Sequence, residues 1–161
     1  VPCCGFIFKE KKSKRKIIKE KINQLNLTVE SIRKFKKGEN FELNGDIIYY
    51  KDVTVKGNRA RSYAYCADTA YDENIIPLIQ NSDLIYYEST FLDDMENKAK
   101  KTKHSTASQA ARIAKMANCK ELIIGHFSAR YDNTEDFVNQ ANIIFENTIA
   151  AYDGYTHQIN I

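Results

Sequence analysis

Short apolar stretches alternate with lysine-rich ones in the N-terminal part of the chain and predict a series of small elements. Residues 4–8 are predicted to form a strand. Ile18, Ile22 and Leu25 then recur at helical spacing, which predicts an amphipathic and basic helix over residues 13–25. The apolar side chains of this helix would face a core while its lysines stay in water.

Capping and turn residues mark the next two elements. Thr28 can cap a helix that runs through Lys37, and Gly38 can end that helix in a left-handed conformation. Asn44-Gly45 lies between two short apolar runs, which is the strongest short-range signal for a β-hairpin. Residues 51–61 are polar and are predicted to form a loop.

From residue 62 onward, strand-like apolar runs alternate with helical patterns. The predicted strands are 62–66, 84–88, 121–125 and 155–161. The predicted helices are 73–79, 105–117 and 134–150, and a polar helix or loop leads up to Lys103. This alternation is typical of α/β architecture. We therefore predict an α/β unit preceded by a basic region of helix and hairpin.

Composition is that of a globular protein rather than a disordered or membrane one. Hydrophobic residues make up 43% and charged residues 28%, and no apolar run approaches membrane-spanning length. No secretory signal is visible, so we expect a cytoplasmic protein without a membrane partner. The net charge is only +3, but basic residues concentrate in 9–21 and 33–37. That concentration favours a polyanionic partner.

The cysteines and the N-terminus add two expectations. Cys3, Cys4, Cys66 and Cys119 show no CxxC spacing and are interpreted as reduced, mostly buried thiols. The chain has no initiator Met and begins directly in a predicted strand. We therefore expect it to be a portion of a longer protein.

Four polar residues share one topological position. Asp68, Glu88 and His126 each end or follow a predicted strand, and His104 precedes the alanine-rich helix. Ligands of α/β sheets bind outside the carboxyl ends of the strands, so these side chains could converge on one site. Their types suit the inner or outer shell of a zinc ion. The alternative is purely structural, as helix caps or solvated strand ends. His157 has no partner in the pattern and is expected to be structural.

Short motifs surround these residues in a fixed order. They are Ala67-Asp68-Thr69, Glu88-Ser89-Thr90-Phe91, His104-Ser105-Thr106-Ala107 and Gly125-His126-Phe127-Ser128-Ala129-Arg130-Tyr131. The set resembles ribonuclease Z, the tRNA 3′-processing endoribonucleases of the metallo-β-lactamase superfamily. Residues 1–6 and 151–154 fit as well. The resemblance implies that the chain is the C-terminal half of a metallo-β-lactamase αββα sandwich, whose other sheet lies in a missing N-terminal half.

The resemblance also implies a role for each matching site residue. Asp68 matches a carboxylate that bridges two zinc ions, and His126 matches a histidine that completes the shell of the second zinc. Glu88 and His104 match a pair that delivers a proton to the departing 3′ oxygen. Paired zinc ions of this kind activate water and stabilise an in-line displacement at phosphorus.

The implied substrate is precursor tRNA, from which the intact enzyme would remove the 3′ trailer. Ser128 and Arg130 match the segment near the substrate phosphate, and arginine offers a planar fork for phosphate oxygens. The resemblance further implies a homodimer in which the arm of one subunit holds tRNA for the other. Two alternatives remain: another metallo-β-lactamase-fold hydrolase acting on a small phosphodiester, and a non-catalytic RNA-binding module.

Three features depart from the family pattern. Tyr87 stands where the family usually has a histidine before the glutamate. The tRNA-gripping arm lacks its Gly-Pro segment, and we expect Lys14, Arg15 and Lys16 of the basic stretch to contact tRNA phosphates instead; a solvated face is the alternative. The HxHxDH cluster is absent from the sequence, so we expect the chain to be inactive by itself.

Overall fold

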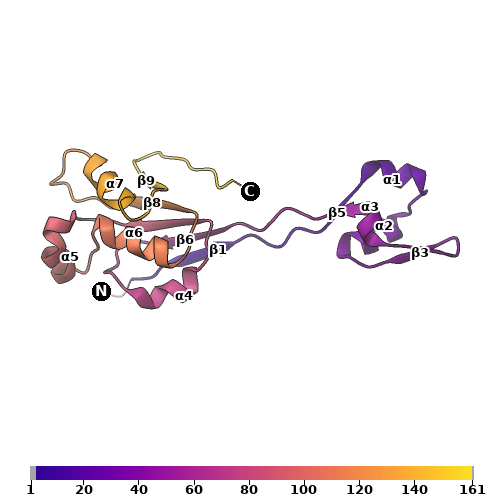
Figure 1. Cartoon of the computed structure of the whole chain (residues 1–161), viewed down its shortest axis with the longest axis horizontal. Helices are drawn as coiled ribbons and strands as arrows, with labels where there is room; N and C mark the ends of the chain where they lie inside the picture. The colour runs from indigo at the N-terminus through magenta and orange to yellow at the C-terminus, as the bar shows by residue number, and fades with distance from the viewer. Residues whose placement is uncertain (1–2, 161) are drawn as a thin grey trace. The chain divides into compact units, whose positions relative to one another are not determined.

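The structure is a computed structural model that describes residues 3–160. The chain divides into two compact units (Figure 1). The larger unit consists of residues 3–9 and 61–160, and the smaller unit consists of residues 10–60. The chain therefore leaves the larger unit after its first strand, β1 (Phe6–Lys9), and returns at Arg61.

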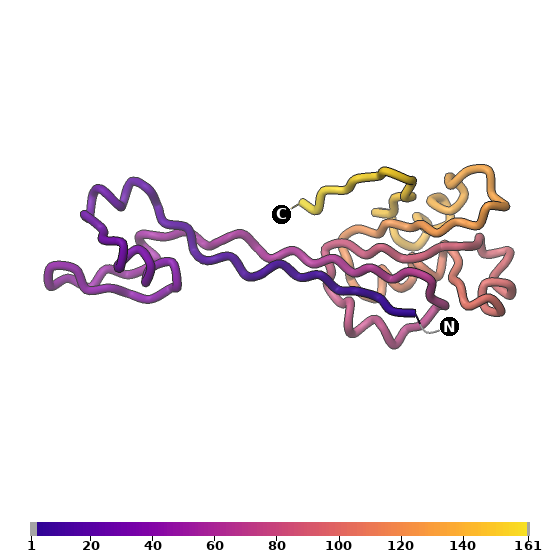
Figure 2. The backbone as a smooth tube through the Cα atoms, turned by 180° about the vertical axis from the view of Figure 1, so that it is seen from behind, coloured from indigo at the N-terminus to yellow at the C-terminus, as the bar shows by residue number. Residues whose placement is uncertain are grey.

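The larger unit is built on a five-stranded sheet in the order β1-β6-β7-β8-β9. The other strands are β6 (Ser62–Cys66), β7 (Leu84–Glu88), β8 (Glu121–Gly125) and β9 (Thr148–Ala150). These four are parallel, whereas β1 runs antiparallel beside β6 (Figure 2). The carboxyl ends of β6, β7 and β8 therefore meet at one edge of the sheet, as the sequence pattern predicts.

Helices cover one face of this sheet (Figure 1). They are η1 (Glu73–Ile75), α4 (Ile76–Ile79), η2 (Asp93–Met95), α5 (Glu96–Thr102), α6 (Ala107–Met116) and α7 (Glu135–Asn142). Ile85, Tyr87 and Leu122 are fully buried in the core between this sheet face and the helices. The small side chains of α6 allow it to approach the strands closely, and Thr106 begins it with a capping box that includes Gln109.

The opposite face of the sheet is aromatic and only partly covered. We call the surface formed by Phe6, Phe8, Tyr63, Tyr65 and Tyr86 the open sheet face. Side chains of paired residues lie on the same side of a sheet, so β1 and β6 contribute two rings each. Phe6 and Phe8 are 53% and 57% exposed, although residues 151–159 border part of this face. Exposed apolar side chains that gather on one surface are common at interaction sites.

The smaller unit has its own core. Its elements are β2 (Lys16–Ile17), α1 (Lys19–Gln24), α2 (Val29–Lys37), β3 (Phe41–Leu43), β4 (Asp46–Ile48), α3 (Tyr50–Val53) and β5 (Thr54–Val55). Leu27, Phe35 and Val53 are buried at its centre. Thr28 caps α2 by accepting from the amide of Ser31, and Gly38 ends it at φ 87°, both as predicted. The Asn44-Gly45 hairpin is confirmed as well.

The predicted basic helix over residues 13–25 is only partly correct. Just α1 is helical, and Lys16–Ile17 pairs with β5 instead. The guanidinium group of Arg15 donates to the side chain of Thr54 at 2.7 Å and lies 4.8 Å from the centre of the Tyr50 ring. These long-range contacts, which periodicity cannot reveal, hold residues 15–17 extended. The loop prediction for 51–61 is wrong where α3 and β5 form.

The C-terminal prediction fails for a similar reason. The helix predicted over 134–150 ends at Asn142, and Thr148–Ala150 pairs with β8 as an added parallel strand. The amide of Leu122 donates to the carbonyl of Asn147, which fixes this pairing. No strand forms over residues 155–160, and Ile161 lies outside the described residues.

The structure also bears on the expected burial of the cysteines and on membrane-spanning helices. Cys66 and Cys119 are buried free thiols, but Cys3 and Cys4 are exposed, so the prediction of mostly buried cysteines is wrong for the N-terminal pair. Among residues 3–160, no helix combines the length and apolar character needed to cross a membrane.

Candidate metal centre

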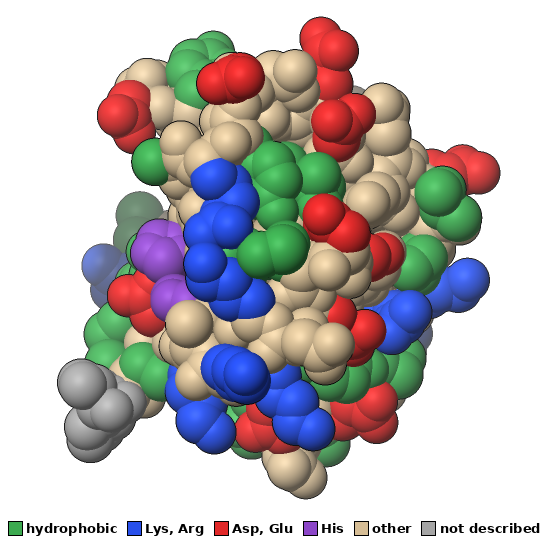
Figure 3. Space-filling view, turned by 90° about the vertical axis from the view of Figure 1, so that its left-hand side faces the viewer, with side chains coloured by type: hydrophobic (Ala, Val, Ile, Leu, Met, Phe, Trp, Pro, Cys, Tyr) green, Lys and Arg blue, Asp and Glu red, His purple; other side chains and the backbone are tan. Residues whose placement is uncertain are grey.

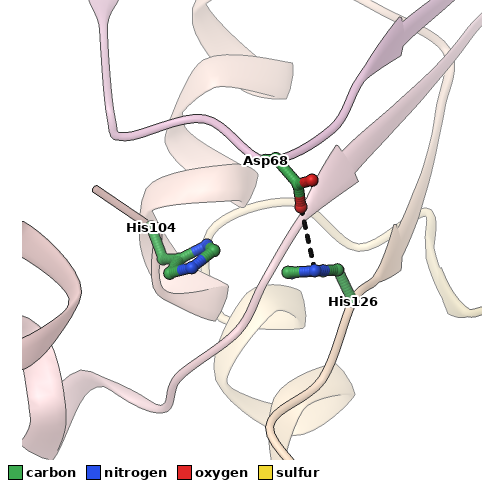
Figure 4. Close-up of side chains that lie close together, drawn as sticks. All are labelled: Asp68, His104 and His126. Atoms are coloured by element: carbon green, nitrogen blue, oxygen red, sulfur yellow. Dashed lines mark ion pairs between the residues drawn. The ribbon is translucent and has the colours of Figure 1, made fainter. Parts of the chain in front are cut away.

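The predicted site residues gather at the carboxyl edge of the parallel strands. Asp68 follows β6, Glu88 ends β7, His126 follows β8, and His104 lies between α5 and α6. Ligand atoms of Asp68, His104 and His126 all lie within 4.8 Å of one another (Figure 4). The rings of His104 and His126 are 5.2 Å apart between centroids. The fold thus brings together three side chains that the sequence separates by 58 positions (126 − 68).

Two of these residues have a backbone conformation that is uncommon for residues other than glycine. Asp68 has φ 49° and His126 has φ 63°, both in the left-handed region. Such conformations persist where the surroundings enforce them, and they cluster at functional sites. Beside His126, a Cβ on Gly125 would come within 2.5 Å of the hydroxyl of Tyr86. Glycine is therefore needed at 125 to let this ring lie against β8.

The carboxylate of Glu88 is the buried anchor of the site. It is fully buried, and its Oε1 lies 2.8 Å from Nδ1 of His104. Its Oε2 accepts hydrogen bonds from the amides of Thr90 and Ser105, each at 3.1 Å, and from the hydroxyl of Thr90 at 2.7 Å. A buried carboxylate needs such donors. Glu88 therefore orients His104 through a contact that the rest of the site holds in place.

Thr90 joins the two halves of the site and has no role in the sequence prediction. Its hydroxyl donates to Glu88 and lies 2.9 Å from Nδ1 of His126. A hydroxyl has one proton to donate, so Nδ1 of His126 must be the donor in the second contact. The Nε2 atom of a neutral His126 is then left with a lone pair. By the same reasoning the Glu88 contact places the proton of a neutral His104 on Nδ1.

This tautomer makes the contact between His126 and Asp68 informative. Nε2 of His126 lies 2.8 Å from Oδ1 of Asp68, the contact drawn in Figure 4. With the ring neutral and the carboxylate ionised, both atoms are hydrogen-bond acceptors that repel each other, and a cation between them would remove this repulsion. A proton on Nε2 or a metal ion would serve. An imidazole nitrogen and a carboxylate oxygen are donors that zinc accepts, so His126 and Asp68 fit the implied metal, while His104 lies close enough to act beside it.

Tyr87 does not disturb the carboxylate next to it. Its side chain is fully buried in the helix-covered core, and its hydroxyl donates to the carbonyl of Ala70 at 3.3 Å. Burial raises the pKa of this phenol well above its ordinary value. Among the described residues, the hydrogen bonds to Glu88 come from Thr90, Ser105 and His104. The departure at position 87 therefore leaves the orientation of His104 intact.

The other predicted residues fall in two places. Ser128 donates its amide to the carbonyl of Thr90, and Arg130 donates to the hydroxyl of Ser128 at 3.0 Å. Arg130 also lies 5.3 Å from the centre of the Phe91 ring, so this pair is next to the site. Lys14, Arg15 and Lys16 belong to the smaller unit. Lys14 and Lys16 are exposed there, whereas Arg15 is half-buried in internal contacts.

His157 has a structural environment away from these residues. Its Nε2 lies 2.7 Å from a carboxylate oxygen of Glu121, and its Nδ1 lies 3.1 Å from the hydroxyl of Tyr155. These contacts tie the C-terminal segment to β8. They agree with the expectation that this histidine is not part of the site.

Comparisons with known proteins give one consistent result. No protein-family model matches the chain. The chain is 40% identical to a ribonuclease Z of Cytophaga hutchinsonii over 162 aligned positions. This alignment covers 99% of the chain and 51% of that protein. A ribonuclease Z of Bacteroides thetaiotaomicron is 39% identical, with the same coverage of both chains. The chain therefore spans about half the length of the curated relatives it matches.

Solved structures agree on the fold. The metallo-β-lactamase-fold protein YhfI of Bacillus subtilis superposes with a TM-score of 0.55 at 27% identity, over 64% of this chain and 44% of that one. The short form of human tRNase Z gives 0.51 at 26% identity, over 71% and 37%. A long-form RNase Z from yeast gives 0.53 at 28% identity, over 60% and 13%. The resemblance to ribonuclease Z and the metallo-β-lactamase fold class are both confirmed.

Proposed function

From this similarity and this site, we propose that the chain forms part of a zinc-dependent endoribonuclease that removes the 3′ trailer from precursor tRNA. The observation that carries the proposal is the convergence of Asp68, His104 and His126 at the carboxyl edge of the sheet. They occupy the motif positions through which the chain resembles ribonuclease Z. Metal-assisted hydrolysis of a phosphodiester uses metal ligands, a proton donor and phosphate contacts, and the chain has candidates for each.

Asp68 and His126 would hold zinc, with Thr90 fixing the tautomer that leaves Nε2 of His126 free for it. Bound zinc lowers the pKa of a water ligand toward neutrality and stabilises charge on phosphoryl oxygens. The buried hydrogen bonds of Glu88 and Thr90 would orient His104 and His126 before the metal binds.

His104 would act as the proton donor to the departing 3′ oxygen. Glu88 holds its Nδ1 at 2.8 Å, so the proton in transit is the one on Nε2. The buried negative charge stabilises the imidazolium form that gives up this proton. Ser128 and Arg130 stand beside Thr90 and Phe91, where they would contact the phosphate group under attack.

We propose further that the complete site needs a second polypeptide surface. The sequence has three histidines, of which His104 and His126 lie at the site, too few for two four-coordinate zinc ions. The open sheet face exposes aromatic side chains that a second sheet could cover. The chain by itself is then inactive. The free thiols fit a reducing compartment such as the cytoplasm, and the resemblance suggests a homodimer.

The smaller unit would bind tRNA phosphates through its exposed lysines. Lys14 is exposed, and Lys16 is exposed and hydrogen-bonded at 2.6 Å to Asn58. Arg15 would support this surface rather than contact phosphate, because its guanidinium group donates to Thr54 and packs over the Tyr50 ring. Contacts between lysines and phosphates would make tRNA binding weaken steeply with salt.

The test is cleavage of a precursor tRNA, with zinc, by the protein expressed from its complete reading frame. We expect a single cut at the 3′ end of the tRNA and a loss of at least about 100-fold in the Asp68→Asn variant. A small model diester should be a much poorer substrate. Faster turnover of the small diester would assign the protein to another hydrolase of this fold. Tight RNA binding without bound zinc and without cleavage would indicate that the protein is a non-catalytic RNA-binding module.

A further inference from the structure

Lys103 adopts a backbone conformation that favours glycine. Helix α5 ends at Thr102, and Lys103 follows it with φ 64° and ψ 39°. The next amide, that of His104, donates to the carbonyl of Ala99 at 2.9 Å and closes the helix end. Helix α2 of the same chain ends with Gly38 in the corresponding left-handed position. Lysine at this position is less favourable than glycine because of its Cβ, which raises the question of what its side chain contributes.

The position of Lys103 suggests what that contribution is. It lines a hollow together with Asp68, His104 and His126, and we call this the metal-site hollow. On the larger unit, lysine and arginine side chains stand directly beside the exposed histidines (Figure 3). Lys100 of α5 lines an adjoining hollow that also includes His104. A positive charge is therefore held at the edge of the candidate metal centre.

Further cations extend this charge around Phe91. Lys98 of α5 lies 5.9 Å from the centre of the Phe91 ring, and Arg130 lies 5.3 Å from it. The ring itself is 6.3 Å from that of His104 between centroids. Two chain segments thus bring their cations to the same buried ring beside the candidate proton donor.

These cations are not neutralised by the carboxylates around them. Within residues 3–160, no ion pair of 4.0 Å or less joins Lys98, Lys100, Lys103 or Arg130 to a carboxylate. The carboxylates that line the two hollows are directed elsewhere: Asp68 contacts His126, whereas Asp72 and Glu96 accept from the neutral groups of Asn74 and Gln109 and keep their charge. Unpaired cations around a hollow create a positive potential that attracts anions.

We propose that Lys103, supported by Lys98 and Lys100, binds backbone phosphates of the RNA strand that enters the metal-site hollow. The inference deepens the proposed function, on which it rests, by naming a phosphate-binding surface next to the bond to be cut. A lysine ammonium is a compact charge with three donors and suits phosphate oxygens in varied geometry. The left-handed backbone at Lys103 sets the direction in which the side chain leaves the helix.

A structural explanation for Lys103 makes the opposite prediction. Cations at a helix C-terminus interact favourably with the helix dipole. Lys100 and Lys101 already supply that interaction in the last turn of α5. If the helix dipole were the reason for lysine at this position, Lys103→Gly would lower the thermal midpoint and leave RNA affinity unchanged. Loss of RNA affinity together with undiminished stability would separate the two explanations.

The experiment measures binding of a fluorescein-labelled precursor tRNA to the full-length protein at several salt concentrations. We expect Lys103→Gly and Lys103→Gln to weaken binding by about fivefold to tenfold near 0.1 M salt and to reduce the salt slope by about one. The thermal midpoint of Lys103→Gly should rise by about 2 °C. Lys103→Arg should bind nearly as well as the parent protein because it keeps the charge.

Two matched controls accompany these variants. Lys115→Gln removes an exposed lysine from the last turn of α6, at the end of that helix remote from His104. Asn118→Gly places glycine at another left-handed position, φ 50°, without changing charge. Unchanged RNA affinity and salt slope in Lys103→Gly would overturn the phosphate site, as would an equal loss in Lys115→Gln. Lys103-dependent RNA binding without cleavage would support the phosphate site and overturn the proposed nuclease.

Discussion

Oε1 of Glu88 lies 2.8 Å from Nδ1 of His104, and this contact links a fully buried carboxylate to a half-buried ring. The remaining oxygen of the carboxylate is held by two amides and a hydroxyl, so the pair has little freedom to rotate. Through Thr90 the same network reaches His126. The orientation of both histidines is therefore set by the protein before any metal or substrate arrives.

Replacing Glu88 by glutamine tests whether its charge matters for the reaction. The amide keeps the size of the side chain but cannot stabilise an imidazolium, so we expect kcat to fall about 100-fold with little change in KM. Nitrogen NMR of the His104 ring should show a shifted tautomer balance. Asp94→Asn, an exposed change on η2, serves as the control. Equal kcat in the two variants would remove Glu88 from the mechanism.

Thr90→Val should uncouple His126 from the buried carboxylate. The change keeps the shape of the side chain but removes the hydroxyl that contacts Oε2 of Glu88 and Nδ1 of His126. We expect the free energy of unfolding to fall by about 1–3 kcal/mol because the buried carboxylate loses a donor. Zinc affinity should weaken about tenfold as the ring becomes free to change tautomer.

Denaturant unfolding and zinc titration measure these two effects of the Thr90 change. Thr156→Val, at an exposed position in the C-terminal segment, provides the matched control. If both threonine variants behave alike, the network through Thr90 has no energetic importance.

Arg15 should differ from its neighbour Lys14 in its effect on the smaller unit. The guanidinium group of Arg15 donates to the side chain and carbonyl of Thr54 and packs over Tyr50, whereas Lys14 is exposed. We expect Arg15→Ala to lower the stability of this unit by about 1–2 kcal/mol and Lys14→Ala to have almost no effect. Protease digestion between residues 10 and 60 measures the difference. A charge-reversal test of RNA binding should therefore use Lys14 and Lys16.

The four free thiols should react in two groups. Cys3 and Cys4 are exposed, whereas Cys66 and Cys119 are 8% and 7% exposed. Burial also raises the pKa of Cys119 to about 12, so almost no thiolate is present near pH 8. Brief alkylation at pH 8 should add two labels to the folded chain and four in denaturant, as counted by mass. Four labels under native conditions would contradict the packing around Cys119.

Alkaline pH should destabilise the larger unit. Burial raises the pKa values of Cys119 and Tyr63 to about 12, so the folded chain keeps protons that the unfolded chain releases. Their stabilising contribution is complete below about pH 8.5 and is lost as the pH rises toward 12. Unfolding midpoints measured between pH 8 and 11 should fall, and less steeply in Cys119→Ala. An unfolding midpoint that does not change between pH 8 and 11 would contradict the raised pKa values of Cys119 and Tyr63.

The sequence by itself determined three of the four parallel strands, β6, β7 and β8, and the placement of the site residues at their ends. The short apolar runs at 84–87 and 122–124 predict buried strands, and parallel strands bring the residues that follow them to one edge. Thr28 and Gly38 fixed the ends of α2 through local capping, which needs no distant partner. The ordered motifs around Asp68, Glu88, His104 and His126 pointed to the family in the same way, because they are short and local.

Only the tertiary structure decided the remaining features. Residues 148–150 form a strand because β8 offers them hydrogen bonds, and residues 15–17 are extended because Thr54 and Tyr50 bind Arg15. The role of Thr90 depends on two partners, one of them 36 positions away in sequence. The strain at Lys103 depends on how α5 ends beside the metal-site hollow. Local propensity is weak, about 1 kcal/mol or less per residue apart from proline, so contacts between distant residues can override it where the two disagree.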